Sequence, residues 1–303
     1  MGVLEVFGFR ALWSPFFLAA LIAILVGYFL ITIKFREKFL TSEPLTRKEA
    51  TLFTTGIALL YLIKGSPLDL MGHLMFYAHM IQMAMLYLVI APILIVGIPK
   101  WIWRNVLNQK LVKPVFQFFT RPLIALVLFN GMFSFYHVPL IFDVIKTDMW
   151  LHASYTSLLF VISIFMWWPL VNDLEEYQTL SGIKKIGYIF ADGILITPAC
   201  ALIIFADSPM YATFSDPTAW MQALELCVPQ TTLASLNLSG PEMFNSLSLI
   251  DDQQLGGVLM KIIQEIVYGV VLAQVFFKWY RKDAAEGKKQ EENPSLYPNL
   301  AEY

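Results

Sequence analysis

The stretch that decides the fold runs from Leu70 to Gly97 and reads LMGHLMFYAHMIQMAMLYLVIAPILIVG. It is apolar over most of its length, and about 20 consecutive apolar residues are enough for a helix to cross a bilayer. We therefore expect a single membrane-spanning helix over residues 70–97. Polar side chains within such a helix usually face protein or a cavity, so His73, His79 and Gln82 are candidate functional residues.

Methionines flank one histidine of this stretch at helical spacing. Met75, His79 and Met83 stand four residues apart and would form one stripe along a continuous helix. Thioether and imidazole ligands favour Cu(I), whereas Mg²⁺ and Ca²⁺ prefer oxygen ligands. Two interpretations stay open on this stretch alone. One is a soft-metal site, and the other is ordinary packing, because methionine is also a common gap-filling residue.

The composition is typical of a multi-pass membrane protein, with 57% hydrophobic and 15% charged residues. The net charge of −2 offers no basic surface for phosphates, so we expect no nucleic-acid partner. Cys200 and Cys227 show neither the spacing of a zinc site nor a disulfide framework. No catalytic constellation stands out, and we expect the protein not to be an enzyme.

Seven segments are long and apolar enough to span a bilayer. They cover residues 12–33, 49–64, 70–97, 122–138, 149–170, 186–206 and 254–279. The sequence thus predicts an all-α polytopic membrane protein with a seven-helix transmembrane domain over residues 1–280. A long loop over 207–253 separates the last two segments, and the segment TAWMQALELCV within it predicts a short amphipathic surface helix. The polar residues 281–303 predict a disordered tail.

Basic residues predict the orientation of the chain. Seventeen of the 21 lysines and arginines follow the first, third, fifth and seventh segments. Cytoplasmic loops are enriched in these residues, so the C-terminus is expected in the cytoplasm and the N-terminus outside. The loop over 207–253 contains no lysine or arginine and is expected outside as well.

This topology places all four histidines in the outer half of the membrane. His73 and His79 lie in the outer part of the third segment, His137 ends the fourth and His152 begins the fifth. Taken singly, His137 and His152 could each cap a helix end or contact lipid headgroups. Together, three segments that bring histidines to one leaflet favour a shared site.

Polar residues also occur in and before the last segment. Lys261 and Glu265 are four residues apart on one helical face, a spacing that lets the two charges neutralise each other. Asp192 is an isolated carboxylate in the sixth segment, for which the sequence names no partner.

Several pieces of the chain together carry a family resemblance. They are LEVFGFRALWSPFF, SPLDLMGHLMFYAHMIQMAMLYLVIAPILIVGIP, RPLIALVLFN, YHVPLIFD, LHASYTSLLFVISIFMWWPL and DDQQLGGVLM. The chain resembles the CtaG-type assembly factors of bacterial caa-type cytochrome c oxidase, most closely the Bacillus-type members. In the family pattern, histidines recur at the positions of His73, His79, His137 and His152, and an Asp-Gln-Gln motif matches Asp252, Gln253 and Gln254.

Two departures from the family pattern affect the candidate site. Many relatives have a second histidine in the third segment where this chain has Met83. Many also have a further histidine about one turn after the position of His152, where this chain reads SYTS. The site in this chain is therefore expected to be richer in thioether and poorer in imidazole.

The resemblance implies an accessory protein of the bacterial plasma membrane that helps to make an active haem–copper oxidase by assisting copper delivery. The implied partners are oxidase subunits, the lipid bilayer and another copper carrier. The predicted metal ligands are His73, Met75, His79, Met83, His137 and His152, and the other polar residues of interest are Asp252, Gln253, Gln254, Lys261 and Glu265.

Three alternatives stay open. Paired histidines on facing helices could bind haem in a membrane redox protein. A metal-free scaffold could hold an oxidase subunit through its outer loop, with histidines that bond only internally. A retinal-type or transporter bundle fits Lys261, but the third segment has no carboxylate counter-ion and no internal repeat stands out, so it ranks last.

Overall fold

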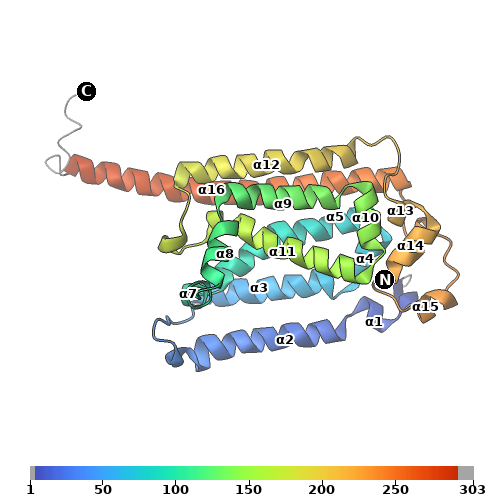
Figure 1. Ribbon diagram of the computed structural model, residues 1–303, viewed down its shortest axis with the longest axis horizontal. Helices are drawn as coiled ribbons and strands as arrows, with labels where there is room; N and C mark the ends of the chain where they lie inside the picture. The colour runs from blue at the N-terminus through green and yellow to red at the C-terminus, as the bar shows by residue number, and fades with distance from the viewer. Residues whose placement is uncertain (1–3, 293–303) are drawn as a thin grey trace.

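The structure is a computed structural model that describes residues 4–292, and within these residues it contains helices and no strand (Figure 1). Five helical segments are long and apolar enough to cross a membrane: Pro15–Lys34, Phe76–Gly97, Met149–Val171, Gly182–Ile204 and Leu249–Ala285. Two bent pairs raise the number to as many as seven, namely Arg47–Lys64 with Pro67–Leu74 and Val112–Phe119 with Pro122–Tyr136. The predicted all-α, multi-pass membrane fold is confirmed.

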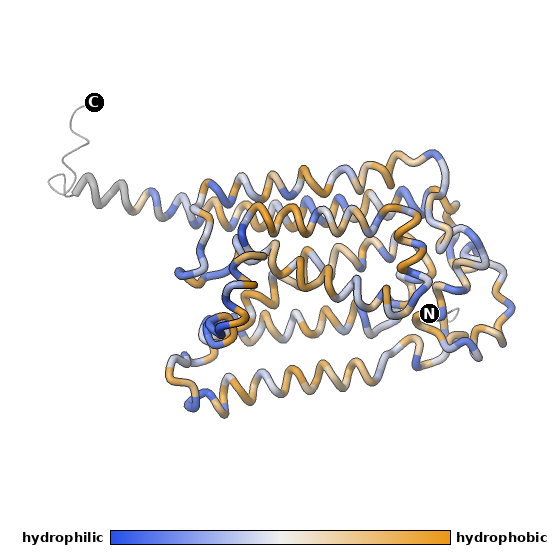
Figure 2. The backbone as a smooth tube through the Cα atoms, in the orientation of Figure 1, coloured by the Kyte–Doolittle hydropathy of each residue, from blue (hydrophilic) through white to orange (hydrophobic). Residues whose placement is uncertain are grey.

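The long elements follow the predicted segments closely. They are α2 (Pro15–Phe29) with a π-helical extension over Leu30–Lys34, α3 (Arg47–Lys64), α4 (Pro67–Leu74), α5 (Phe76–Ala84), a π-helical stretch over Met85–Ile90, α6 (Ala91–Gly97), α9 (Pro122–Tyr136), α11 (Met149–Val171), α12 (Gly182–Ile204) and α16 (Leu249–Glu292). Figure 2 shows that their residues are mostly apolar and that polar residues concentrate at the turns.

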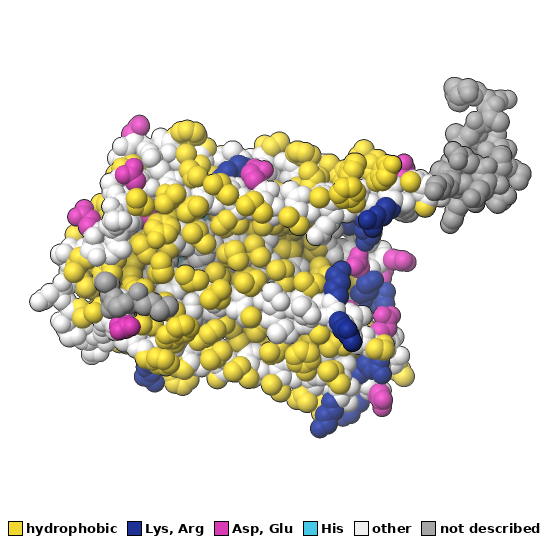
Figure 3. Space-filling model, turned by 180° about the vertical axis from the view of Figure 1, so that it is seen from behind, with side chains coloured by type: hydrophobic (Ala, Val, Ile, Leu, Met, Phe, Trp, Pro, Cys, Tyr) yellow, Lys and Arg dark blue, Asp and Glu magenta, His cyan; other side chains and the backbone are white. Residues whose placement is uncertain are grey.

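Short helices cover the two ends of the bundle. At one end lie α7 (Lys100–Leu107) and α8 (Val112–Phe119). At the opposite end lie α1 (Phe9–Leu12), α10 (Pro139–Lys146), α13 (Ala212–Ser215), α14 (Pro217–Leu224) and α15 (Gln230–Ser235). We call this second end the outer end. On the face drawn in Figure 3, lysines and arginines gather at the other end, from which α16 projects.

Proline and capping residues set where the helices begin. Pro67, Pro122 and Pro139 occupy the first turn of α4, α9 and α10, where a missing N–H costs no hydrogen bond. Thr46 and Glu49 form a reciprocal capping box at the start of α3. A local signal of this kind explains why the start predicted at residue 122 agrees with the observed start of α9.

The predicted continuous helix over residues 70–97 is wrong at Met75. This residue has an extended backbone, with φ −133° and ψ 135°, and it separates α4 from α5. The backbone N–H groups of Phe76 and Tyr77 that the break leaves free donate to the Asp252 carboxylate, at 2.8 and 3.0 Å. Residues 67–74 instead form a pair with α3, bent by 46°.

The outer loop is shorter and more ordered than predicted. Because α16 begins at Leu249, the loop after α12 ends at residue 248 rather than 253. The predicted short surface helix is present as α14, with Trp220 and Leu224 buried against the bundle. At the other end of α16, residues 281–292 are helical, and residues 293–303 of the predicted tail lie outside the described part of the chain.

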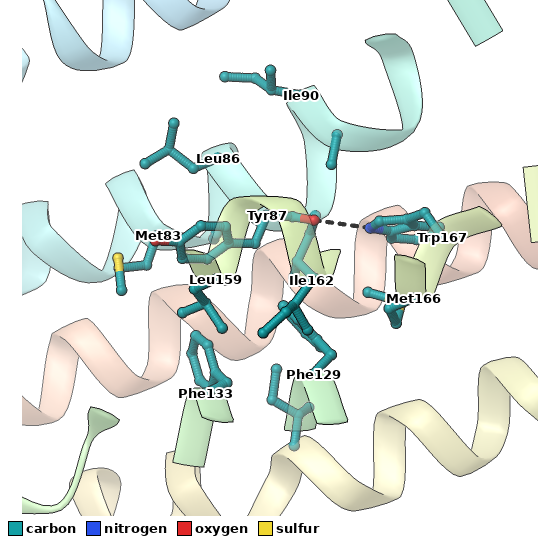
Figure 4. Close-up of a cluster of buried hydrophobic side chains, with 14 of the residues drawn as sticks. Met83, Leu86, Tyr87, Ile90, Phe129, Phe133, Leu159, Ile162, Met166 and Trp167 are labelled. Carbon is teal, nitrogen blue, oxygen red and sulfur yellow. Dashed lines mark hydrogen bonds between the residues drawn. The ribbon is translucent and has the colours of Figure 1, made fainter. Parts of the chain in front are cut away.

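The core forms around α5, the π-helical stretch and α6. Met83, Tyr87, Phe133 and Trp167 are buried there with residues of α9 and α11 (Figure 4). The Trp167 indole N–H donates to the Tyr87 carbonyl at 2.8 Å. At Gly97, an added Cβ would lie 2.6 Å from the Phe53 backbone nitrogen, so only glycine allows α6 to approach α3 this closely.

Candidate functional site

The structure brings the four histidines to the outer end in two pairs. His73 in α4 and His152 in α11 have ring centroids 5.6 Å apart. His79 in α5 and His137, the residue that caps the C-terminus of α9, have centroids 6.4 Å apart. Four different helices therefore supply the imidazoles, because the break at Met75 puts His73 and His79 on separate elements.

Each of these histidines has one buried ring nitrogen without a hydrogen-bond partner among the described residues. The atoms are Nδ1 of His73 and His152 and Nε2 of His79 and His137. The side chains of His73 and His79 are each only 2% exposed. A buried polar atom normally finds a partner, because leaving it unpaired costs about 1–3 kcal/mol. Four such atoms lie at the outer end, where a bound ion could satisfy them.

His137 shows how one imidazole is oriented. Its Nδ1 lies 2.8 Å from the Phe133 carbonyl oxygen, to which it can only donate. In a neutral imidazole this bond leaves the lone pair on Nε2, the unpaired atom. Metal-bound histidines are held in the same manner, with one ring N–H bonded to a carbonyl. The side chain could therefore bind a metal ion through Nε2.

Aromatic rings enclose His79. The centroids of Phe142, Tyr136 and Phe214 lie 5.1, 6.0 and 6.1 Å from that of its imidazole. Rings packed this closely leave the His79 imidazole room to bind a bare ion rather than a flat macrocycle such as haem.

The two methionines of the predicted stripe are separated. Met83 belongs to the core that contains Phe133 and Tyr136. Met75 packs in a second cluster with Leu70, Trp220 and Leu224 of the outer end. The continuous helix that the predicted stripe assumes is interrupted at the extended Met75, and the two methionines pack in different clusters.

The Asp-Gln-Gln motif ties α16 to the neighbouring segments. Asp252 accepts the hydrogen bonds from the first residues of α5, as described above. The side-chain oxygen of Gln253 accepts from the Met210 backbone N–H at 2.7 Å. The Gln254 amide donates to the Ala206 carbonyl at 3.0 Å. All three side chains therefore position backbone next to the histidines.

Polar residues inside the spans form internal pairs. Lys261 and Glu265 make the predicted ion pair at 2.8 Å, and Lys261 also donates to the Thr197 hydroxyl at 3.0 Å. Asp192, for which the sequence named no partner, accepts hydrogen bonds from the Asn130 amide and the Tyr268 hydroxyl. These contacts give the mid-membrane charges a structural role.

The structure adds Asp69 and Cys227 to the outer end, and sequence reasoning missed both as site residues. One Asp69 oxygen accepts from Lys64 at 2.5 Å and from Gln82 at 2.8 Å. The Cys227 thiol lies 3.8 Å from the other Asp69 oxygen. Burial, followed by the Asp69 charge, raises the pKa of this thiol. The spacing of Asp69 and His73 on one helical face was a usable signal, whereas Cys227 gave none.

A lysine is buried beside the same residues. Lys146 is fully buried, donates to the Gly72 carbonyl at 2.9 Å and lies 4.0 Å from the centre of the Phe214 ring. Burial lowers the pKa of this ammonium group well below its usual range.

Comparisons with known proteins give the family. The chain is 25% identical over 266 residues to two uncharacterized mycobacterial proteins, Mb0105 of Mycobacterium bovis and MT0111 of Mycobacterium tuberculosis. The match covers 82% of this chain but only 36% of each of those proteins, so the chain spans about a third of their length. No solved structure matches the chain. The family described as cytochrome c oxidase caa3 assembly factor (Caa3_CtaG) matches residues 26–282, and the chain belongs to this family.

Proposed function

We propose that the protein assists the insertion of copper into a caa3-type cytochrome c oxidase through a Cu(I) site at its outer end. Membership of the assembly-factor family supports the link to the oxidase. The proposed ligands are the imidazoles of His73, His79, His137 and His152 and the thioether of Met83, and we call this set the histidine site. Met75 is left out because it packs in a separate cluster.

The observation that carries this proposal is the set of four unpaired ring nitrogens. Seven other buried side-chain atoms among the described residues also lack a partner, but none of them is a nitrogen with a free lone pair, which is what Cu(I) binds. Neutral imidazole together with a thioether is a ligand set suited to Cu(I). The protein then acts as an accessory factor rather than an enzyme, and it hands its cargo to an oxidase subunit.

Delivery of copper from outside the cell requires a particular topology. In it, the chain crosses a bacterial plasma membrane seven times, with the N-terminus outside and the C-terminus in the cytoplasm. The two bent helix pairs support the number seven. The gathering of lysines and arginines at the end opposite the histidines supports the orientation, because basic residues favour the cytoplasmic side (Figure 3). The histidine site would then face the compartment where an external copper carrier can reach it.

Cysteine labelling in intact cells tests this orientation. In a chain without Cys200 and Cys227, a cysteine at the exposed Ser239 should react with a membrane-impermeant maleimide. A cysteine at the exposed Gln109, between α7 and α8, should react only after the membrane is permeabilised. The reverse pattern would place the histidines on the cytoplasmic side and rule out the proposed delivery from outside.

Copper binding by the purified protein tests the function. His79→Ala should abolish Cu(I) binding, because this imidazole is enclosed and lies between two of the helices that supply ligands. His137→Ala and His152→Ala should weaken binding. Met83→Leu keeps the volume and removes the thioether, so it should lower Cu(I) affinity with little effect on folding. Met80→Leu is the matched control, since Met80 is equally buried on α5 but packs against Gly256 of α16.

The same variants separate delivery from a scaffold role in cells. Under the copper proposal, each histidine variant accumulates normally, yields less active oxidase and is partly rescued by added copper. A metal-free scaffold predicts lower abundance of the His79→Ala protein and no rescue. A Soret band in purified wild-type protein would instead identify haem as the ligand.

A further inference from the structure

We propose that Asp69, His73 and Cys227 form a binding site for a borderline divalent metal ion of the Zn²⁺ class, which fastens the outer segment between α14 and α15 to α4. One ligand atom from each of these side chains lies within 4.8 Å of the other two. The site shares His73 with the histidine site, whereas Asp69 and Cys227 belong to it alone.

The side chains are available as ligands. Nδ1 of His73 is buried and has no hydrogen-bond partner among the described residues. Lys64 and Gln82 occupy one oxygen of Asp69 and fix the orientation of the carboxylate, while the other oxygen faces the Cys227 sulfur. Partners that orient a ligand in this way are typical of metal sites.

The chemistry of the three groups favours a borderline divalent ion. Zn²⁺ accepts thiolate, imidazole and carboxylate together, whereas Cu(I) prefers sulfur and nitrogen to a carboxylate oxygen. Zinc bonds of about 2.0–2.3 Å place neighbouring ligand atoms about 3.5 Å apart, so the cluster needs to contract by roughly 1 Å. A water completes the coordination, since His152 is assigned to the histidine site.

Binding exchanges a proton for the metal ion. In the structure the Cys227 thiol points its proton at the Asp69 carboxylate. The S–H bond breaks, the proton leaves to solvent, and sulfur and oxygen each bind the ion. The thiolate and the carboxylate then supply two negative charges, which the ion shares with the Lys64 ammonium paired to Asp69, and no oxidation state changes.

The site would add a cross-link between distant parts of the chain. Cys227 is 158 residues from Asp69 in the sequence, and the neighbouring α14 packs near α4 through an apolar cluster that contains Leu70, Leu74 and Trp220. A bond through a metal ion is directional and fixes the outer segment more firmly than apolar packing does.

Cobalt absorption is the first test, since Co²⁺ reports a thiolate ligand by charge-transfer absorption in the near ultraviolet. Purified full-length wild-type protein and the Cys200→Ser variant should both show this absorption, and Zn²⁺ should displace it. Cys227→Ser should lose it. Cys200 is the matched control, because it is the other cysteine of the chain and is buried in α12. Absorption that persists without Cys227, or that depends on Cys200, would overturn the proposal.

Thiol protection is the second test and keeps the ligand intact. In the Cys200→Ser background Cys227 is the sole thiol, and Zn²⁺ should slow its reaction with N-ethylmaleimide by about tenfold or more. Adding His73→Gln or Asp69→Asn should remove the protection. An unchanged reaction rate would show that no site exists. His79→Ala should keep the zinc protection while losing Cu(I) binding, so the two proposals fail independently.

Discussion

Replacing Asp252 by alanine is expected to destabilise the protein more than any other change to the Asp-Gln-Gln motif. The substitution leaves the N–H groups of Phe76 and Tyr77 without their acceptor at a buried helix start. Each unpaired buried group costs about 1–3 kcal/mol, and hydrogen bonds to a charged acceptor lie at the upper end. We therefore expect a loss of about 2–6 kcal/mol, seen as a lower temperature of unfolding in detergent.

The neighbouring aspartate provides the control. Asp251 is exposed, and its carboxylate accepts only from the nearby Ser248 hydroxyl, so Asp251→Ala should change the unfolding temperature little. Asp252→Ala should also weaken Cu(I) binding, because α5 carries His79 one turn after the capped residues. Equal stability of the two variants would show that Asp252 does not hold the break.

The second large effect is expected at Trp167. Its side chain extends from α11 and is fully buried against the π-helical stretch, where its N–H donates to the Tyr87 carbonyl (Figure 4). Removing a buried tryptophan side chain typically costs about 3–5 kcal/mol through lost packing and the cavity left behind. Trp167→Ala should therefore unfold at a much lower temperature and accumulate poorly in the membrane.

Two further variants divide this loss into its causes. Trp167→Phe keeps most of the apolar volume and removes the hydrogen bond, so its loss should be nearer to 1–3 kcal/mol, roughly the cost of one unpaired buried carbonyl. Trp150 lies on the same helix and is 78% exposed, so Trp150→Ala should be almost neutral. A Trp150 effect as large as that of Trp167 would contradict this account of the core.

The helices were predictable because the signals that set them are local. Pro67, Pro122 and Asp148 mark helix starts, and long apolar runs between them match the thickness of a bilayer. Hydropathy also identified the outer loop, although α16 begins inside its predicted range. The positions of the helices therefore follow from short-range sequence alone.

The break at Met75 was not predictable in this way. The residues around Met75 are apolar and contain neither proline nor a glycine at the break itself, so nothing local opposes a helix there. The carboxylate that stabilises the break is on Asp252, 176 residues away. The same holds for Cys227, which reaches Asp69 only through the fold of the outer loop. Long-range polar contacts of this kind leave no periodic pattern in the sequence.

Because the helix is broken at Met75, the six-residue spacing between His73 and His79 does not fix the angle between their side chains. In an uninterrupted α-helix six residues correspond to a rise of about 9 Å and a rotation of about 600°, which leaves two side chains pointing about 120° apart. The extended Met75 removes that constraint, and each imidazole takes its direction from its own helix. The same two histidines transplanted into an uninterrupted helix would diverge to different sides of it. The carboxylate from α16 is therefore as much a part of the histidine arrangement as the imidazoles themselves.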